Sequence, residues 1–395
     1  MPADHRESVQ PPWLDLDALL ADPLIKIIVC CGAGGVGKTT TAAALGLRAA
    51  ERHGRRTVVL TIDPARRLAQ SLGLTELDNT PRQVKGVDSD QHPGRPVPGE
   101  LHAMMLDMKR TFDEVVAAHT DPRKAEEILA NPFYQAMSAT FAGTQEYMAM
   151  EKLSQLRSRD EWDLIVVDTP PSRSALDFLD APARLSRFLD GRMLRLLLAP
   201  ARAGGHRVFS LVSASFGLFS RAMTRVVGTQ LLADLSGFVG ALDSMFGGFR
   251  ERAERTYQVL QASETAFLVV AAPEPDAIRE ASYFAGRLAD DRMPLAGLVL
   301  NRVATVAAPA ISAATARAAA ATLTDLGAND VTAALLNLHA GLVEQVDRQQ
   351  SVAGRFVAAN PGVPVARVAA QPADVHDLDG LRSIGAGLAT RTDAP

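Results

Sequence analysis

The sequence predicts an α/β fold, in which a doubly wound, mostly parallel sheet carries an inserted α-helical subdomain. Short apolar segments alternate with helix-forming segments along most of the 395 residues, and this alternation is typical of parallel strands joined by helices. The apolar segments lack the polar alternation of a half-exposed strand, as in the run Val58, Val59 and Leu60. Residues 190–260 depart from this order, because their apolar side chains recur at gaps of three and four.

The composition is that of a globular protein in a reducing compartment. Hydrophobic residues make up 47% of the chain and charged residues 22%, and the net charge of −4 disfavours a nucleic-acid partner. The two cysteines, Cys30 and Cys31, are adjacent, which excludes a disulfide framework and a C-x-x-C metal site. The sequence suggests no signal peptide and has no apolar run of about 18 residues. We therefore expect a cytoplasmic protein with at most indirect membrane association.

The first predicted strand ends in a glycine-rich turn, within the stretch IIVCCGAGGVGKTTTA at 27–42. Gly32, Gly37, Lys38 and Thr39 fit the phosphate-loop (P-loop) pattern G-x-x-x-x-G-K-[ST]. Glycines allow backbone N–H groups to surround a phosphate, and the helix that follows directs its positive end there. Lys38 would contact the outer phosphates and Thr39 would ligate magnesium. The loop residues predicted to contact a nucleotide are Gly32, Gly34, Gly35, Val36, Gly37, Lys38, Thr39 and Thr40.

A dinucleotide-binding loop is the competing interpretation of the same glycines. Gly32, Gly34 and Gly37 also match G-x-G-x-x-G, and Asp63 follows the next strand about where a ribose-binding acid belongs. Lys38 favours the triphosphate loop, because a dinucleotide loop has no use for a buried ammonium there. A turn that merely joins strand to helix is disfavoured by the acidic residues further along the chain.

Two acidic residues close apolar strands. Asp63 ends the strand in TVVLTIDPARRL at 57–68, and Asp168 ends the strand in EWDLIVVDTPPS at 161–172. The carboxyl ends of parallel strands meet at one edge of a sheet, where α/β proteins bind ligands. Asp168 therefore fits a Walker B position that supports magnesium next to the phosphate loop.

The remaining chain is expected to form one domain, residues 21–395, after an N-terminal tail, residues 1–20, that holds a short helix. The helical subdomain is expected at about 110–160 and 185–262, and an alanine-rich helix at about 309–323. Residues 85–100, rich in proline and glycine, predict an exposed loop. Four more strands are expected, in LHAMMLDM (101–108), TAFLVVAAPEP (265–275), PLAGLVLNRV (294–303) and VPVARVAAQP (363–372), and a last helix from about Val375.

The loop, the DPA and DTPP motifs and the helical insertion, in this order, resemble the ArsA family over residues 25–390. That family includes the arsenite-pump ATPase and the guided-entry ATPase for tail-anchored membrane proteins. The resemblance implies a dimeric ATPase that uses ATP and Mg²⁺. It implies that Asp63 orients the attacking water, that Asp168 supports magnesium through water, and that Lys38 stabilises the phosphates. It further implies that Asn301 recognises adenine, that Gln371 and Pro372 line the base, and that Glu146 belongs to a dimer-facing acidic segment.

One departure from the family bears on activity. Members usually carry a signature lysine after the first glycine of the loop, whereas this chain has Ala33. A methyl group cannot offset developing negative charge, so the chain is expected to turn over slowly. Arg66 or Arg67 could substitute, although a pair of surface arginines is the other interpretation. A homodimer and a heterodimer with a paralogue that keeps the lysine both remain open. Arsenite binding is disfavoured, because soft metalloids need thiolates.

The apolar stripes of residues 208–249 allow two interpretations. They can pack as an ordinary helical core, or they can form a groove for an apolar client helix, for which phenylalanine and methionine are suited. Three functions follow: an ATP-driven dimeric switch with a client groove, a catalytically weakened nucleotide-binding subunit of a heterodimer, and a partition or septum-positioning ATPase. The last is disfavoured, because the C-terminal RSIGAGLATRTDAP offers neither a basic patch nor a membrane helix.

Overall fold

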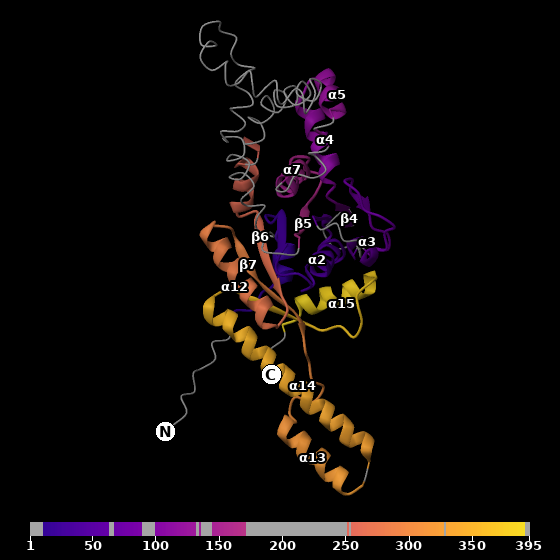
Figure 1. Cartoon of the computed structure of the whole chain (residues 1–395), viewed down its shortest axis with the longest axis vertical. Coiled ribbons are helices and arrows are strands. Elements are labelled where there is room, and N and C mark those ends of the chain that lie inside the picture. Colours follow the sequence, from indigo (N-terminus) through magenta and orange to yellow (C-terminus); the bar gives the residue numbers. More distant parts are fainter. Residues whose placement is uncertain are drawn as a thin grey trace, which may run out of the picture. The chain divides into compact units, whose positions relative to one another are not determined.

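The computed structural model of the chain describes residues 11–62, 67–88, 99–131, 134–135, 144–170, 251–252, 254–327 and 329–391 (Figure 1). Contacts divide the chain into two units. Unit 1 comprises Met1–Met105, Leu156–Leu176 and Val259–Pro395, and unit 2 comprises Leu106–Gln155 and Asp177–Gln258. Among the described residues, no helix combines the length and the apolar character needed to cross a bilayer.

Unit 1 contains an eight-stranded sheet within the described residues, in the order β3-β4-β2-β5-β1-β6-β7-β8. The β3–β4 pairing is antiparallel and the other described pairings are parallel. The predicted doubly wound, mostly parallel α/β sheet is therefore confirmed. The strands are β1 (Ile27–Cys31), β2 (Arg56–Thr61), β3 (Arg82–Gln83), β4 (Glu100–Met105), β5 (Leu164–Asp168), β6 (Thr265–Ala271), β7 (Leu295–Val303) and β8 (Val365–Ala369).

Helices of unit 1 cover both faces of this sheet (Figure 1). On one face, α2 (Lys38–His53) and α15 (Leu378–Ala389) share an apolar core with strand residues such as Ile28 and Val166. The alternate strand residues, such as Val29 and Phe267, point to the opposite face, where α12 (Pro275–Asp290) packs on β6 and β7. Strands β1, β5 and β6 are buried at every position, as their continuous apolar runs predict.

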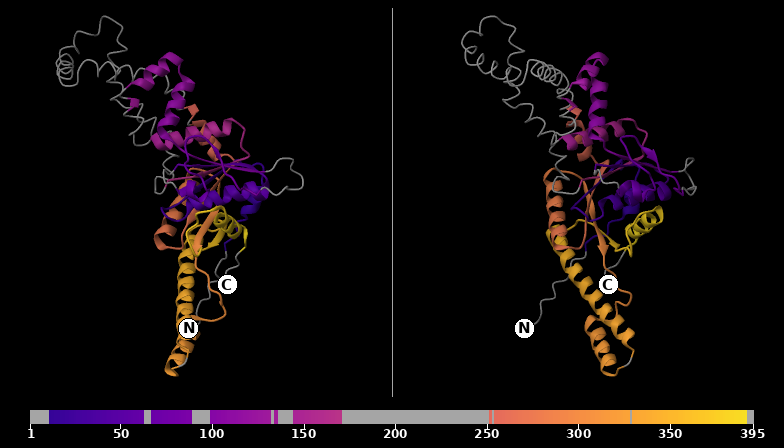
Figure 2. Two further views of the ribbon diagram at one scale, coloured as in Figure 1. Left: turned by 90° about the vertical axis from the view of Figure 1, so that its right-hand side faces the viewer. Right: turned by 45° about the vertical axis from the view of Figure 1, so that its right-hand side comes forward.

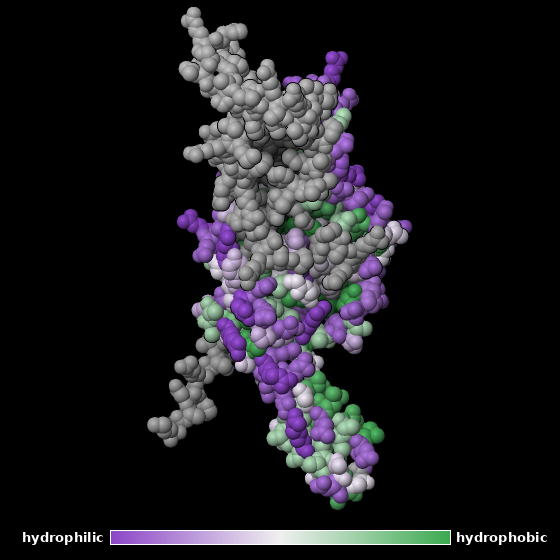
Figure 3. All heavy atoms as spheres, viewed as in Figure 1, coloured by the Kyte–Doolittle hydropathy of each residue, from purple (hydrophilic) through white to green (hydrophobic). Residues whose placement is uncertain are grey.

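The described helices that remain are α1 (Leu16–Ala21), α3 (Arg67–Ser71), α4 (Met108–His119), α5 (Pro122–Ala130), α7 (Thr144–Ser158), α13 (Ala313–Asp325) and α14 (Asp330–Ala359). Helix α13 matches the predicted alanine-rich helix, whereas the 30-residue α14 was not anticipated. The two form a hairpin in which α13 lies along the first half of α14 (Figure 2). Apolar side chains gather on this hairpin (Figure 3). The large ones that are exposed are Ile311, Leu326, Val331, Leu335 and Leu338.

Residues 11–21, which the sequence assigns to a tail, pack on unit 1. Leu16 and Leu20 of α1 are fully buried, and Asp15 caps the helix by accepting from the Ala18 N–H at 2.9 Å. Trp13 forms an isolated parallel bridge with Val365 of β8. The short helix expected within the tail at 1–20 is therefore present, and its apolar face packs on the domain.

Helices α4 and α5 and most of α7 belong to unit 2. Ion pairs join its described parts, including the buried Lys152 to Glu114 at 2.7 Å and the buried Glu151 to Arg252 at 3.0 Å. The predicted apolar stripes of residues 208–249 lie outside the described residues. Whether they form a core or a groove therefore stays a prediction.

Candidate nucleotide-binding site

The glycine-rich loop follows the central strand of the sheet. Strand β1 lies between β5 and β6, so the loop at its carboxyl end opens at the edge where α/β sheets bind ligands. Gly37 is the N-cap residue of α2, and no side chain caps this helix. The first N–H groups of α2 therefore lack side-chain acceptors and can receive an anion.

Two loop glycines are required by close contacts as well as by their backbone angles. Gly32 has φ 149°, and a Cβ placed there would lie 2.1 Å from the carbonyl oxygen of Val270. Gly37 has φ 94°, and its Cβ would lie 2.2 Å from Nδ2 of Asn301. Any side chain at either position would clash and strain the backbone. The loop thus keeps a shape in which backbone groups can approach a phosphate closely.

Lys38 brings a positive charge to this loop. Its side chain is buried, and Nζ donates a hydrogen bond to the carbonyl oxygen of Ala33 at 2.7 Å. The lysine therefore folds back over the turn that it follows. An ammonium held there is placed to contact the outer phosphate oxygens of a nucleotide on the loop.

Asp168 connects three strands at the same edge. It is fully buried at the end of β5 and lies beside Cys30 of β1 and Thr61 of β2 in the sheet register. Its Oδ2 accepts from the hydroxyl of Thr39 at 2.7 Å and from the hydroxyl of Thr61 at 2.9 Å. Thr169 fixes the end of the strand by donating to the carbonyl oxygen of Cys30 at 2.8 Å. The structure thus brings the loop threonine and the strand-end acid together.

The oxygen donors at this point fit Mg²⁺. The hydroxyl of Thr39 and the carboxylate of Asp168 are hard ligands of the kind that magnesium prefers. Within the described residues no group of three or more histidine, cysteine or acidic side chains could hold a metal ion. Protein sites usually bind magnesium through one or two carboxylates, with substrate phosphates and water completing the shell.

A cavity of about 620 Å³ extends from the loop across the sheet edge. It is lined by Gly37, Thr39 and Thr40 on the loop side and by Gln371 and Pro372 on the far side. Asn301 of β7 also lines it and donates from Nδ2 to the carbonyl oxygen of Val36 at 2.9 Å. Three of the predicted loop residues, Gly37, Thr39 and Thr40, therefore line the same cavity as Asn301, Gln371 and Pro372, which are predicted for the base end.

Three residues at the site, Thr61, Arg302 and Ile384, were not predicted from the sequence. Thr61 donates a hydrogen bond to the carboxylate of Asp168, and its position two residues before the DPA motif was the available signal. Arg302 has φ 62° beside a register shift in β7 and lines the cavity, as does Ile384 of α15. Neither belongs to a local motif, so only the folded chain identifies them.

Four predicted residues cannot be placed in this site. Asp63 and Arg66 lie outside the described residues. Arg67 begins α3 and Glu146 lies in α7, but the side chains of both are outside the described part. The water-orienting role of Asp63 and the compensating role of an arginine remain predictions.

Burial keeps the two cysteine thiols protonated and unreactive. Both are fully buried, and burial raises the pKa of the Cys31 thiol to about 12 and the pKa of Cys30 well above its usual value. A thiol that stays protonated is a poor nucleophile and a poor ligand for a soft metalloid. These two side chains serve the core of the sheet.

Residues 25–317 match the family model of the ArsA ATPases, described as anion-transporting ATPase. The chain belongs to the ArsA ATPase family. It is similar to the ATPase get3 of Schizosaccharomyces pombe, at 27% identity over 237 residues, which are 60% of this chain and 61% of that protein.

Two further relatives match shorter segments. A putative arsenical pump-driving ATPase of Prosthecochloris vibrioformis is 29% identical over 166 residues, 41% of this chain and 37% of that protein. An uncharacterised protein of Streptomyces coelicolor is 32% identical over 180 residues, 45% of this chain and 41% of that protein. The chain thus spans between 37 and 61% of the length of these three relatives.

Proposed function

We propose that this chain is an ATP-binding and ATP-hydrolysing switch protein of the ArsA type, which works as a dimer. The observation that carries the proposal is the contact of Thr39 with Asp168 at one sheet edge, next to Lys38 of the same loop, where Thr39 also lines a cavity of about 620 Å³. This set provides an ammonium, a metal-binding hydroxyl and a carboxylate next to backbone N–H groups, which are the parts that phosphoryl transfer requires.

Each residue has a separate task in the proposed reaction. The N–H groups at the start of α2 bind phosphate oxygens, and Lys38 offsets charge on the outer phosphates. Thr39 supplies a ligand for magnesium, and Asp168 orients that hydroxyl and binds water of the magnesium shell. When bound, magnesium neutralises charge on the phosphate oxygens. Asp63 orients the attacking water, a role that rests on the family resemblance.

The test of this proposal is ATP turnover by purified protein. Lys38→Ala removes the ammonium and Asp63→Asn removes the predicted orienting carboxylate, and we expect each to abolish turnover. Arg317→Ala provides a control of similar size, since Arg317 forms an exposed ion pair with Glu344 on the α13–α14 hairpin. Turnover that is unchanged in Lys38→Ala would refute the assignment.

Ala33 favours a second candidate, a catalytically weakened subunit of a heterodimer. Position 33 carries a methyl group where the family usually has its signature lysine. A paralogue that retains the lysine could then supply the missing charge, giving an asymmetric pair. Turnover of the isolated chain compared with turnover after co-purification from its host separates the two candidates. A high rate for the isolated chain would exclude the weakened-subunit alternative.

The cargo of the proposed switch is an apolar protein helix or a partner subunit that docks on the helical subdomain. The proposal is motivated by the apolar stripes predicted for residues 208–249. Affinity purification with and without a non-hydrolysable ATP analogue tests it. Recovery of the same proteins in both states would argue against nucleotide-controlled binding.

A further inference from the structure

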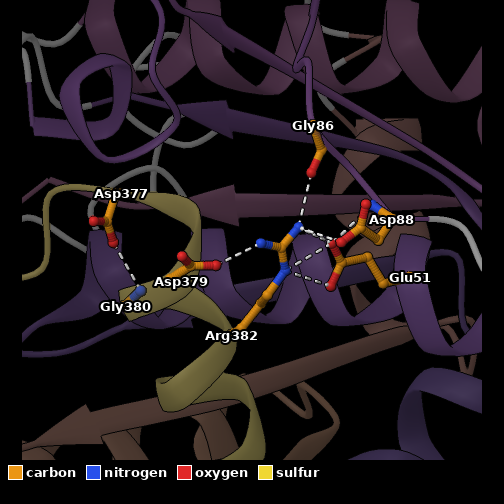
Figure 4. Close-up of polar contacts among 7 residues, drawn as sticks. All are labelled: Glu51, Gly86, Asp88, Asp377, Asp379, Gly380 and Arg382. Carbon is orange, nitrogen blue, oxygen red and sulfur yellow. Dashed lines mark hydrogen bonds and ion pairs between the residues drawn. The ribbon is translucent and has the colours of Figure 1, made fainter.

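Arg382 of α15 joins three segments that are far apart in the sequence (Figure 4). It donates from Nε and Nη2 to the carboxylate of Glu51, in the last turn of α2, at 3.1 and 2.8 Å. Nη2 also donates to the carbonyl oxygen of Gly86 at 2.7 Å and lies 3.4 Å from the carboxylate of Asp88. Nη1 donates to Asp379 of the same helix at 2.7 Å.

The contact with Glu51 is the strong one in this cluster. The Glu51 side chain is only 10% exposed, whereas those of Asp88 and Asp379 are 82% and 87% exposed. Exposed ion pairs contribute little, but a two-pronged, charge-assisted contact to a buried carboxylate is both strong and directional. Glu51 also accepts from the backbone N–H of Asp88 at 3.0 Å, so its own position is fixed.

The two helices that Arg382 connects both contribute residues to the cavity. Helix α2 begins with Lys38 and Thr39 at the phosphate loop. Helix α15 contributes Ile384 to the cavity, and its Ser383 hydroxyl donates to Oε1 of Gln371 at 3.2 Å. Movement of α15 relative to α2 would therefore move the far wall, residues 369–376, relative to the loop.

We propose that Arg382 is a positioning residue for nucleotide binding, which sets the distance between the phosphate loop and the wall that faces the nucleoside. The inference rests on the proposed ATP site and assigns it a determinant outside the cavity. Arg382 does not line the cavity, and its polar partners within the described residues are Glu51, Gly86, Asp88 and Asp379, so it acts through the packing of α15 on α2. Its effect falls on the nucleoside end, because the loop residues themselves are held by β1, β5 and β6.

Comparison of two ligands separates this role from a general structural one. ATP needs both walls, whereas inorganic tripolyphosphate needs only the loop. For Arg382→Gln we expect the Kd of ATP to rise about fivefold or more, which is the lower end of typical coupling between sites. The Kd of tripolyphosphate should stay within about twofold in the same titration.

Four further variants control the experiment. Glu51→Gln should reproduce the loss for ATP, and the double variant with Arg382→Gln should be no weaker than either single variant. Arg382→Lys keeps a charge and a donor and should recover part of the affinity. Arg317→Gln removes an exposed arginine on α13 and should change neither ligand. Thermal unfolding of each variant verifies that the fold is intact.

The outcomes are distinguishable. An unchanged Kd for ATP in Arg382→Gln, or an equal loss for both ligands, overturns the positioning role and leaves the ATP site standing. Binding of neither ligand by the unaltered protein overturns the proposed ATP site and the positioning role with it.

Discussion

Asp168→Asn tests the metal half of the site with little change in shape. Both threonine hydroxyls, of Thr39 and Thr61, donate to the same carboxylate oxygen, at 2.7 and 2.9 Å. An asparagine side chain can present its carbonyl oxygen at that position and keep both hydrogen bonds. The substitution therefore removes the negative charge but leaves two acceptor contacts that anchor β5 to β2 and to α2.

The expected magnitudes follow from these contacts. Since each retained hydrogen bond contributes about 1 kcal/mol, the free energy of unfolding should change by less than about 1 kcal/mol. The effect on magnesium should be larger, because in the proposed site Asp168 orients a metal ligand and the water around it. Loss of such an outer partner typically lowers metal affinity about 10- to 100-fold.

The assay is a fluorescence titration with an ATP analogue, carried out with magnesium and with a chelator. In the unaltered protein magnesium should strengthen binding, and in Asp168→Asn most of that increase should disappear. Asp163→Asn is the matched control. Asp163 lies directly before the first residue of β5, where its carboxylate accepts from the Arg56 N–H at 3.0 Å. Because this end of the strand lies away from the loop, nucleotide binding by Asp163→Asn should keep its dependence on magnesium. An Asp168→Asn variant that retains full magnesium dependence would refute the assignment of this carboxylate.

Two predictions concern the core of unit 1. Arg55 is buried and donates to the carbonyl oxygens of Leu20, Asp22, Ile25 and Asp163. Arg55→Met leaves these buried oxygens without their donor, so the free energy of unfolding measured in urea should fall by about 3 kcal/mol or more. A loss below about 1 kcal/mol, as expected of an exposed-arginine control, would show that water replaces these bonds. The pKa of Cys31 is raised from 9.0 to about 12, so stability from its protonated thiol is complete below pH 9 and is lost as the pH rises towards 12. At pH 8 a thiol reagent should label neither cysteine until the protein unfolds, and rapid labelling of the native protein would contradict this burial.

The site residues that lie in short sequence motifs could be predicted, whereas those placed by contacts between distant segments could not. The loop from Gly32 to Thr39 and the acid Asp168 could be predicted, because each requirement is met by a few consecutive residues after one buried strand. Their meeting point also followed, since parallel strands end at a common edge. Thr61 and Arg302 could not be assigned, because their contacts depend on strand order and on a register shift in β7.

The fold, too, could be predicted where it depends on local sequence patterns. The alternation of apolar runs and helical periods was sufficient for a doubly wound sheet, because buried parallel strands need apolar residues on both faces. Helix α14 was not anticipated, although Asn360, Pro361 and Gly362 follow its last residue and are typical of a helix end. The sequence indicated the short helix near the N-terminus but could not decide where it packs, because Leu16 and Leu20 become core residues only when α2 lies beside them.

The sequence by itself determined the family, the sheet and the glycine-rich loop that ends in Thr39, because covalent neighbours are enough to build a turn, a strand or a helix start. Only the tertiary structure decided that Asp168 bonds Thr39 and Thr61, that α15 supplies a cavity wall, and that Arg382 holds it to Glu51. Arg382 and Glu51 are 331 positions apart, and no local pattern specifies a contact over that distance. It arises because burial of the apolar faces of α2 and α15 on one side of the sheet brings the two charges together.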